Sequence, residues 1–365
     1  MKSPRFPVVC VCRYLQSIRK NEPPRARRKD EKQSREPDEA LRARLSAAGI
    51  KRKFLDETVL PSWWDESLAL TPGGFREVVA YISANLCYSM KSLLDPSTHL
   101  EISRPVAVKY KKGKGISEDD VCLSTQIALG LARTVANAMK ENPPFEGLPA
   151  PEEWRPRLLE KSDQQWICLR HILRFAWDAG ISVVHLRNLP KDAKKPDALA
   201  TMVGDRPVIV LLSKRKSPSW IAFTVAHELG HIRCGHLKPG QTLVDGNIDS
   251  QSDEKEEIEA NAYAKTLLTG FSDLGLSPSS KLGPPQLVHM ARDFGKKYRV
   301  APGVTALNYA FTTGAWPVAI AALSILEKND DASLDLSKAM LSNLAEDDTT
   351  EEAWEFISRT TDPEG

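Results

Sequence analysis

The chain has 365 residues, of which 41% are hydrophobic and 27% are charged, and its formal net charge is +2. This composition is ordinary for a globular protein of one large or two smaller domains, and the low net charge makes no overall case for nucleic-acid binding. The six cysteines are scattered, which suits reduced thiols in a cytosol rather than a disulfide framework. No apolar run reaches membrane-spanning length, because the longest, residues 316–326, contains Pro317. We therefore expect a cytoplasmic protein without a membrane partner.

Residues 1–38 form a basic and polar N-terminus for which we expect disorder. The stretch is rich in charge and contains Pro23, Pro24 and Pro37, a composition that buries too little apolar surface to fold. Its first residues lack the apolar stretch of a secretory signal.

Residues 39–100 are helical in pattern. A short helix over 39–47, a break at Gly49 and a basic helix over 51–58 resemble a helix-turn-helix. One hypothesis is that residues 39–60 contact DNA. The other is a plain helical bundle whose basic residues form a solvated face. The sequence names no set of base-reading side chains, so both interpretations stay open.

Residues 101–162 are expected to form a linker followed by a long helix. The basic run at 109–114 indicates a flexible connector. Ser117 and Asp120 resemble a capping box that opens a helix reaching about Lys140, where an Asn-Pro-Pro sequence stops it.

Residues 163–275 are predicted to form the compact core of the chain. An amphipathic helix is expected over 164–177, where apolar residues recur at helical spacing. Three strands follow, the last two joined by a Gly-Asp turn, at residues 181–186, 198–203 and 207–212. We expect a small antiparallel sheet that packs beneath the next helix.

That next helix contains the sequence HELGH at residues 227–231. Histidines four residues apart lie one above the other on a helix, so His227 and His231 can hold a zinc ion from one side. Glu228 follows the first ligand directly and lies beside the metal, where a general base can take a proton from the attacking water. Ser217 offers an N-cap for this helix, and the residues between the cap and the motif are mostly apolar. The motif predicts a catalytic metal site that hydrolyses amide bonds.

A catalytic zinc keeps three protein ligands, and the sequence offers the third from two places. His236 follows the second histidine by five residues, whereas the metzincin pattern requires six. Residues 252–268 are predicted to form a second helix, whose acidic residues are Glu254, Glu256, Glu257 and Glu259. Periodicity does not choose among them, although Glu256 and Glu259 both lie near the apolar face of that helix.

Residues 276–365 are expected to form a helical extension with an acidic tail. Helices are predicted over 285–298 and 303–312, and one further helix is predicted in the tail beyond residue 328. Together the elements predict an α+β fold that is mainly helical, with a small antiparallel sheet on the motif helix and helical regions at both ends.

Two blocks of the sequence together resemble the ImmA/IrrE family of metallo-endopeptidases. HELGH is followed about 28 residues later by Glu259-Ala260-Asn261-Ala262-Tyr263-Ala264 and then by two leucines. The resemblance covers roughly residues 165–270, and Tyr263 stands where the family usually has phenylalanine. It implies that the glutamate directly before Ala-Asn completes the metal site. The implied ligands are then His227, His231 and Glu259, a gluzincin-like set with Glu228 as the base.

The resemblance also implies a regulatory function. Members of the family cut a partner transcriptional repressor, often in a stress response, so we expect a protein substrate of the repressor or antitoxin-like class. The implied cofactor is Zn²⁺, although nitrogen and carboxylate ligands also suit Mn²⁺. The rival hypothesis is a DNA-binding regulator or antitoxin-like protein whose metal site is structural or sensory.

The residue that would stabilise the oxyanion is not identifiable from the sequence. Tyr263 is the most tempting because it follows Glu259 by one helical turn, yet aromatic residues at helical spacing usually pack in a core. The other candidates are Arg233, His236 and His289.

Overall fold

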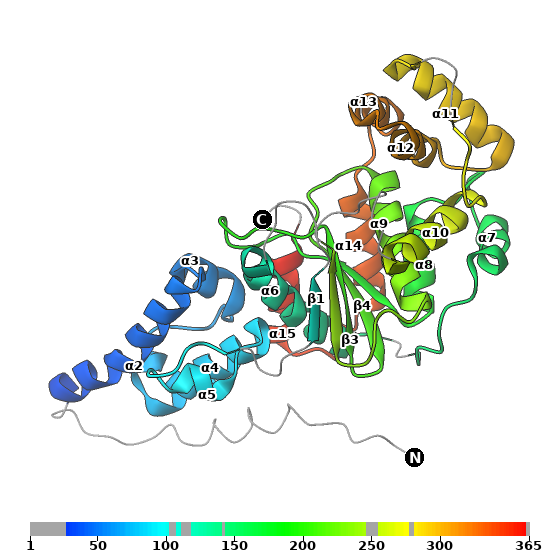
Figure 1. Ribbon diagram of the computed structural model, residues 1–365. Helices are drawn as coiled ribbons and strands as arrows, with labels where there is room; N and C mark the ends of the chain where they lie inside the picture. Colours follow the sequence, from blue (N-terminus) through cyan, green and yellow to red (C-terminus); the bar gives the residue numbers. More distant parts are fainter. Residues whose placement is uncertain are drawn as a thin grey trace.

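A computed structural model of the chain describes residues 27–101, 107–110, 118–140, 143–245, 255–276 and 281–362. Figure 1 shows a central sheet between a group of N-terminal helices on one side and a group of C-terminal helices on the other. The predictions for residues 1–26, for 111–117 and for Glu254 lie outside the described residues. The fold is α+β and mainly helical, as the sequence predicts.

The central sheet has five strands in the order β1-β5-β3-β4-β2. They are β1 (Ala107–Tyr110), β2 (Ser182–His185), β3 (Ala198–Val203), β4 (Arg206–Leu211) and β5 (Gln241–Asp245). The predicted hairpin is present, with Gly204 at a positive φ of 62° in the turn between β3 and β4.

The sheet is mixed and not antiparallel as predicted. Strand β3 runs antiparallel to both of its neighbours, but β2 pairs parallel with β4 and β1 pairs parallel with β5. The strands of each parallel pair are separated in the sequence by other elements. No short turn connects them, so the sequence carries no local signal that predicts their pairing. Strands β1 and β5 were not predicted at all, and β1 lies within the expected linker.

Both faces of the sheet are buried against helices. Val208 and Val210 of β4 contribute to a core shared with α6 (Glu118–Asn137) and α15 (Glu351–Thr361). The alternate residues, Ile209 and Leu211, contribute to a second core with the helices of the metal-motif side. A strand covered on both faces is apolar throughout rather than alternating, which explains the continuous apolar run of β4.

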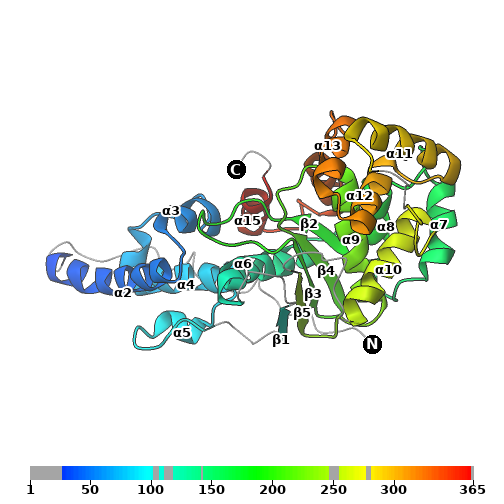
Figure 2. The same ribbon diagram turned by 45° about the horizontal axis from the view of Figure 1, so that its top comes forward.

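Helices α8 (Leu169–Asp178) and α9 (Pro218–Arg233) pack on the second face. Outside them, α10 (Lys255–Thr269) packs on α9, and α7 (Pro151–Glu160) packs on α10. Figure 2 shows α9 and α10 on one side of the sheet and α6 on the other. The predicted cap is present, because the Ser217 hydroxyl accepts a hydrogen bond from the backbone N–H of Trp220.

Helices α9 and α10 approach each other unusually closely at Gly230. A Cβ atom at this position would lie 2.8 Å from Cα of Ala260 and 2.9 Å from its carbonyl oxygen. Real side chains do not tolerate such contacts, so the glycine of HELGH is what allows the two helices to touch. The residues of the metal motif and those of α10 therefore face each other across a very narrow interface.

The N-terminal helices are α2 (Arg27–Ala47), α3 (Arg52–Phe54), α4 (Pro72–Leu86) and α5 (Met90–Leu94), with a π-helical turn η2 (Leu55–Val59) and a 3₁₀ turn η3 (Leu68–Leu70). Helix α2 begins inside the stretch for which disorder was expected. The predicted break is at Gly49, where φ is 89°. Leu41 and Leu45 of α2 lie in the same core as Val208, so this region is continuous with the central sheet.

The C-terminal extension contains α11 (Pro284–Tyr298), α12 (Pro302–Thr313), α13 (Trp316–Leu326), α14 (Ala332–Asn343) and α15. Helices α11 to α13 share a small core of their own, whereas α14 packs against β2 and α8. The tail therefore holds two helices where one was predicted. Among the described residues, no helix is long and apolar enough to cross a membrane.

Candidate metal centre

Helix α9 brings the two motif histidines together as the sequence predicts. The side chains of His227 and His231 are fully buried, and their Nε2 atoms lie 3.0 Å apart. Their ring planes are nearly perpendicular, with centroids 4.7 Å apart. Both Nε2 lone pairs can therefore be directed at one common point between the rings.

The third donor at this point comes from Glu257 of α10. Its carboxylate oxygens lie 3.3 Å from Nε2 of His227 and 3.4 Å from Nε2 of His231. Donors bound tetrahedrally to zinc at about 2.0–2.2 Å are separated by about 3.3 Å, so the observed spacing is the one that such an ion requires. The donor set of two imidazoles and one carboxylate fits a divalent cation on both distance and chemistry.

The structure brings Glu257, and not Glu259, to the two histidines. An α-helix turns about 100° per residue, so two carboxylates separated by two positions point about 200° apart. Asn261 follows Glu257 by one turn, shares its face, and accepts a hydrogen bond of 3.0 Å from Nδ1 of His227. The place beside the two histidines, which the resemblance implied for Glu259, is thus taken by Glu257 in the structure.

Glu259 lies instead in an outer cluster with Cys234 and His236, whose donor atoms lie within 4.8 Å of one another. The Nε2 atom of His236 is 2.8 Å from a carboxylate oxygen of Glu259, and this hydrogen bond lowers the pKa of the glutamate below its ordinary value. The other ring nitrogen of His236, Nδ1, is 2.8 Å from Nδ1 of His231. His236 therefore connects a motif histidine to Glu259.

The predicted base, Glu228, is fully buried on α9 beside the two histidines. The Glu228 carboxylate is excluded from solvent by α9 itself and by the elements that pack on this helix. Burial of an ionisable group at such a depth is rare unless a charge or a hydrogen bond compensates it.

The four candidates for the oxyanion donor lie in different surroundings. Tyr263 is buried, and its hydroxyl makes no hydrogen bond within the described part of the chain. Burial raises its pKa, and the charged groups that act on it are Arg233, Cys234 and Glu152. His289 is exposed on α11, where it pairs with Asp293.

The basic residues between 39 and 60, a stretch described throughout, all contact groups of the protein itself. The Arg42 guanidinium pairs with Asp38 and Asp56, and that of Arg44 donates to backbone carbonyls of residues 92, 93 and 98. The remaining ion pairs lie nearer the surface and join Lys51 to Asp192, Arg52 to Asp56 and Glu66, and Lys53 to Glu57. Arg42 and Arg44 therefore stabilise the fold, and DNA contact through this region stays a prediction.

Sequence reasoning left Glu257 as one of four acidic candidates without selecting it, and it did not identify Asn261. The signal that identifies them is the phase of α10, because Ala260, Ala264 and Leu268 are buried and lie at three, seven and eleven positions after Glu257. If Tyr263 and Leu267 are instead taken to define the buried face of α10, that face is shifted by one residue along the helix. The acidic residues that lie nearest to it are then Glu256 and Glu259.

Comparison with known families matches residues 177–270 to a peptidase family described as the IrrE N-terminal-like domain. The matched segment contains HELGH, β2 to β5 and all of helix α10. No curated protein matches the chain.

Proposed function

On the premise that residues 177–270 form a metallopeptidase domain of the ImmA/IrrE family, we propose that this chain is a zinc-dependent regulatory endopeptidase. The ligands are His227, His231 and Glu257, and the base is Glu228. The observation that carries the proposal is the mutual spacing of the three donor groups, 3.0 to 3.4 Å, at a fully buried point.

The tautomer of His227 supports its role as a ligand. Its Nδ1–H donates to the Asn261 side-chain oxygen, so a neutral ring keeps its lone pair on Nε2, the atom directed at the centre. If the side-chain oxygen of Asn261 were replaced by a group that cannot accept a hydrogen bond, the His227 ring could also adopt the tautomer protonated on Nε2.

A second chain of hydrogen bonds fixes the tautomer of His231. Glu259 is ionised and only accepts, so the Nε2 atom of His236 must donate to it. A neutral His236 then accepts on Nδ1, and the Nδ1–H of His231 donates to it. The lone pair of His231 is thereby left on Nε2, facing the metal. Glu259 and His236 are positioning residues for a ligand and are not ligands themselves.

The chemistry divides between the metal and Glu228. A zinc ion bound here would supply Lewis acidity, which polarises the scissile carbonyl and acidifies a water molecule. Glu228 accepts a proton from the attacking water and delivers it to the leaving amine. Its burial keeps bulk water from competing for that proton.

The substrate class follows from the resemblance and not from the site. Because ImmA/IrrE members cut partner repressors, we propose a repressor or antitoxin-like regulator as the substrate, with cleavage restricted to few proteins. The centre itself supports only metal-dependent peptide hydrolysis.

The test uses the full chain with a regulator encoded beside it as substrate. Wild-type protein should bind one zinc ion and cleave the regulator, and a chelator should stop cleavage. Glu228→Gln should keep the metal content of the wild type and lower the cleavage rate by about 100-fold or more. A wild-type chain that binds zinc but cleaves no regulator would favour a structural or sensory site, and full activity of Glu228→Gln would exclude the proposed base.

A further inference from the structure

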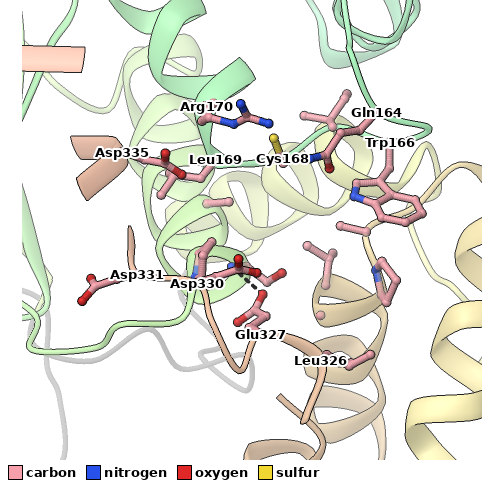
Figure 3. A pocket seen from close by; sticks show the side chains of 18 of the residues that line it. Gln164, Trp166, Cys168, Leu169, Arg170, Leu326, Glu327, Asp330, Asp331 and Asp335 are labelled. Atoms are coloured by element: carbon pink, nitrogen blue, oxygen red, sulfur yellow. Dashed lines mark hydrogen bonds between the residues drawn. The ribbon is translucent and has the colours of Figure 1, made fainter. Parts of the chain in front are cut away.

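A second group of reactive side chains lies outside the metal centre, where helix α8 begins. Cys168 is the N-cap of α8 and lines a cavity of about 820 Å³. Figure 3 shows the cavity, with the Cys168 sulfur and Arg170 on one side and Glu327 across from them. The remaining walls come from the starts of α9 and α12, from α11, and from the segment that leads into α14 together with α14 itself.

The sulfur of Cys168 is the first member of a cysteine–histidine–aspartate series. Its Sγ atom lies 3.1 Å from Nδ1 of His171, an atom that the backbone N–H of Cys168 also approaches to 3.1 Å. Nε2 of the same ring lies 3.2 Å from a carboxylate oxygen of Asp163. A nucleophile in contact with an imidazole that is itself oriented by a carboxylate is the arrangement that activates thiols. The series is formed by residues on both sides of the N-terminus of α8.

The surroundings favour the thiolate form of Cys168. Burial raises the pKa of the thiol, but the hydrogen bond and charge of His171 and backbone N–H groups of α8 outweigh it, so the pKa is lowered. The thiolate in turn raises the pKa of His171, with Asp163 adding to the effect. Arg170 adds a positive charge beside the sulfur. Partial positive charge at the helix N-terminus acts in the same direction.

We propose that Cys168 is an oxidation site whose sulfur attacks and reduces hydroperoxides. The thiolate attacks the terminal peroxide oxygen, an S–O bond forms and the O–O bond breaks. The sulfur loses two electrons and becomes a sulfenic acid, while the departing oxygen takes the proton of the His171 imidazolium and leaves as water or an alcohol. An external thiol can then return the sulfenic acid to the free cysteine.

Solvent exposure alone predicts a different order of cysteine reactivity from the order that thiolate formation predicts. Cys234 is exposed, whereas Cys168 is half-buried and Cys87 is fully buried. A reaction limited by access would therefore modify Cys234 first, and a reaction limited by thiolate formation would modify Cys168 first. The two cysteines form an internal comparison within one protein.

The test is peroxide oxidation of the full chain at neutral pH, with sulfenic acids trapped by dimedone and mapped by mass spectrometry. Cys168 should be trapped roughly tenfold faster than Cys234, because an ordinary thiol is only a few per cent ionised near neutrality. His171→Ala should slow trapping at Cys168 by roughly tenfold, and Asp163→Asn should slow it less. His289→Ala, which removes an exposed histidine of α11, should leave the rate unchanged.

The proposal is overturned if Cys234 is trapped as fast as Cys168, or if His171→Ala keeps the wild-type rate at Cys168. Iodoacetamide labelling of the wild-type protein provides a second measurement that needs no variant, and it should show the same preference for Cys168. A helical circular-dichroism signal equal to that of the wild type confirms that each variant is folded. None of these readouts depends on peptide cleavage.

Discussion

The inner centre (His227, His231 and Glu257) and the outer cluster (Cys234, His236 and Glu259) use similar residue types yet differ in burial. The inner side chains are almost completely excluded from solvent, whereas Glu259 keeps 39% of its side-chain surface exposed and Cys234 lies at the surface. A buried carboxylate needs a cation to offset its desolvation, and an exposed one does not. The comparison teaches that two glutamates separated by one residue can have different roles, with the phase of the helix deciding which is the ligand.

The sharpest way to break this comparison is to remove each carboxylate in turn. Glu257→Ala should lower zinc affinity by more than about 100-fold, beyond the range typical of changes to groups that only support a ligand. Competition with a chromophoric chelator measures the affinity. Glu256→Ala, a neighbouring change on the same helix, serves as the control and should bind as the wild type does. Retained affinity in Glu257→Ala would return the third ligand position to Glu259.

His236→Ala should give the next largest effect. Loss of the acceptor for Nδ1 of His231 frees the ring to adopt the unproductive tautomer, and zinc affinity should fall by about 10- to 100-fold. Zinc stoichiometry adds a second readout, because a positioning role predicts one ion per chain in the wild type. Two ions, with one lost in His236→Ala, would instead make the outer cluster a metal site of its own.

Glu259→Gln should have the smallest effect of the three. Glutamine keeps an oxygen that accepts from His236, so zinc affinity should fall less than tenfold and less than in Glu259→Ala. Lys255→Ala removes only an exposed partner, 3.6 Å from Glu259, and is the matched control. Equal losses in the glutamine and alanine variants would mean that charge, and not the hydrogen bond, is what Glu259 contributes.

The sequence predicts the motif helix well because its signals are local. The Ser217 cap, the proline that follows it and the spacing of His227 and His231 all act within one helix, and the structure has each of them. The hairpin of β3 and β4 is equally local, since Gly204 determines its turn. Elements that are defined by their own residues are therefore predictable from one sequence.

Contacts between distant segments account for what the sequence does not predict. Strands β1 and β5 are short, and they are held in the sheet by hydrogen bonds to strands that lie far away in the sequence. Glu257 reaches the two histidines only because Gly230 lets α10 approach α9 on the face that Ala260 and Asn261 define. The pattern of apolar residues on α10 is weak, since small alanines fill the interface, and its phase is therefore ambiguous.

The return of the chain's C-terminal end to the sheet sets a limit on how the molecule can be divided. The backbone N–H groups of Arg187 and Asn188 both donate to the carbonyl of Thr360 on α15, and Phe356 of the same helix lies in the hydrophobic core that contains Val208. A fragment that keeps only the family-matched segment, residues 177–270, would lack the helices that cover one face of the sheet. The apolar side chains on that face would be exposed to solvent, and we expect such a fragment to aggregate. The peptidase domain therefore depends on the helices that flank it, and loss of the last helix, α15, should destabilise the fold that holds the HELGH motif.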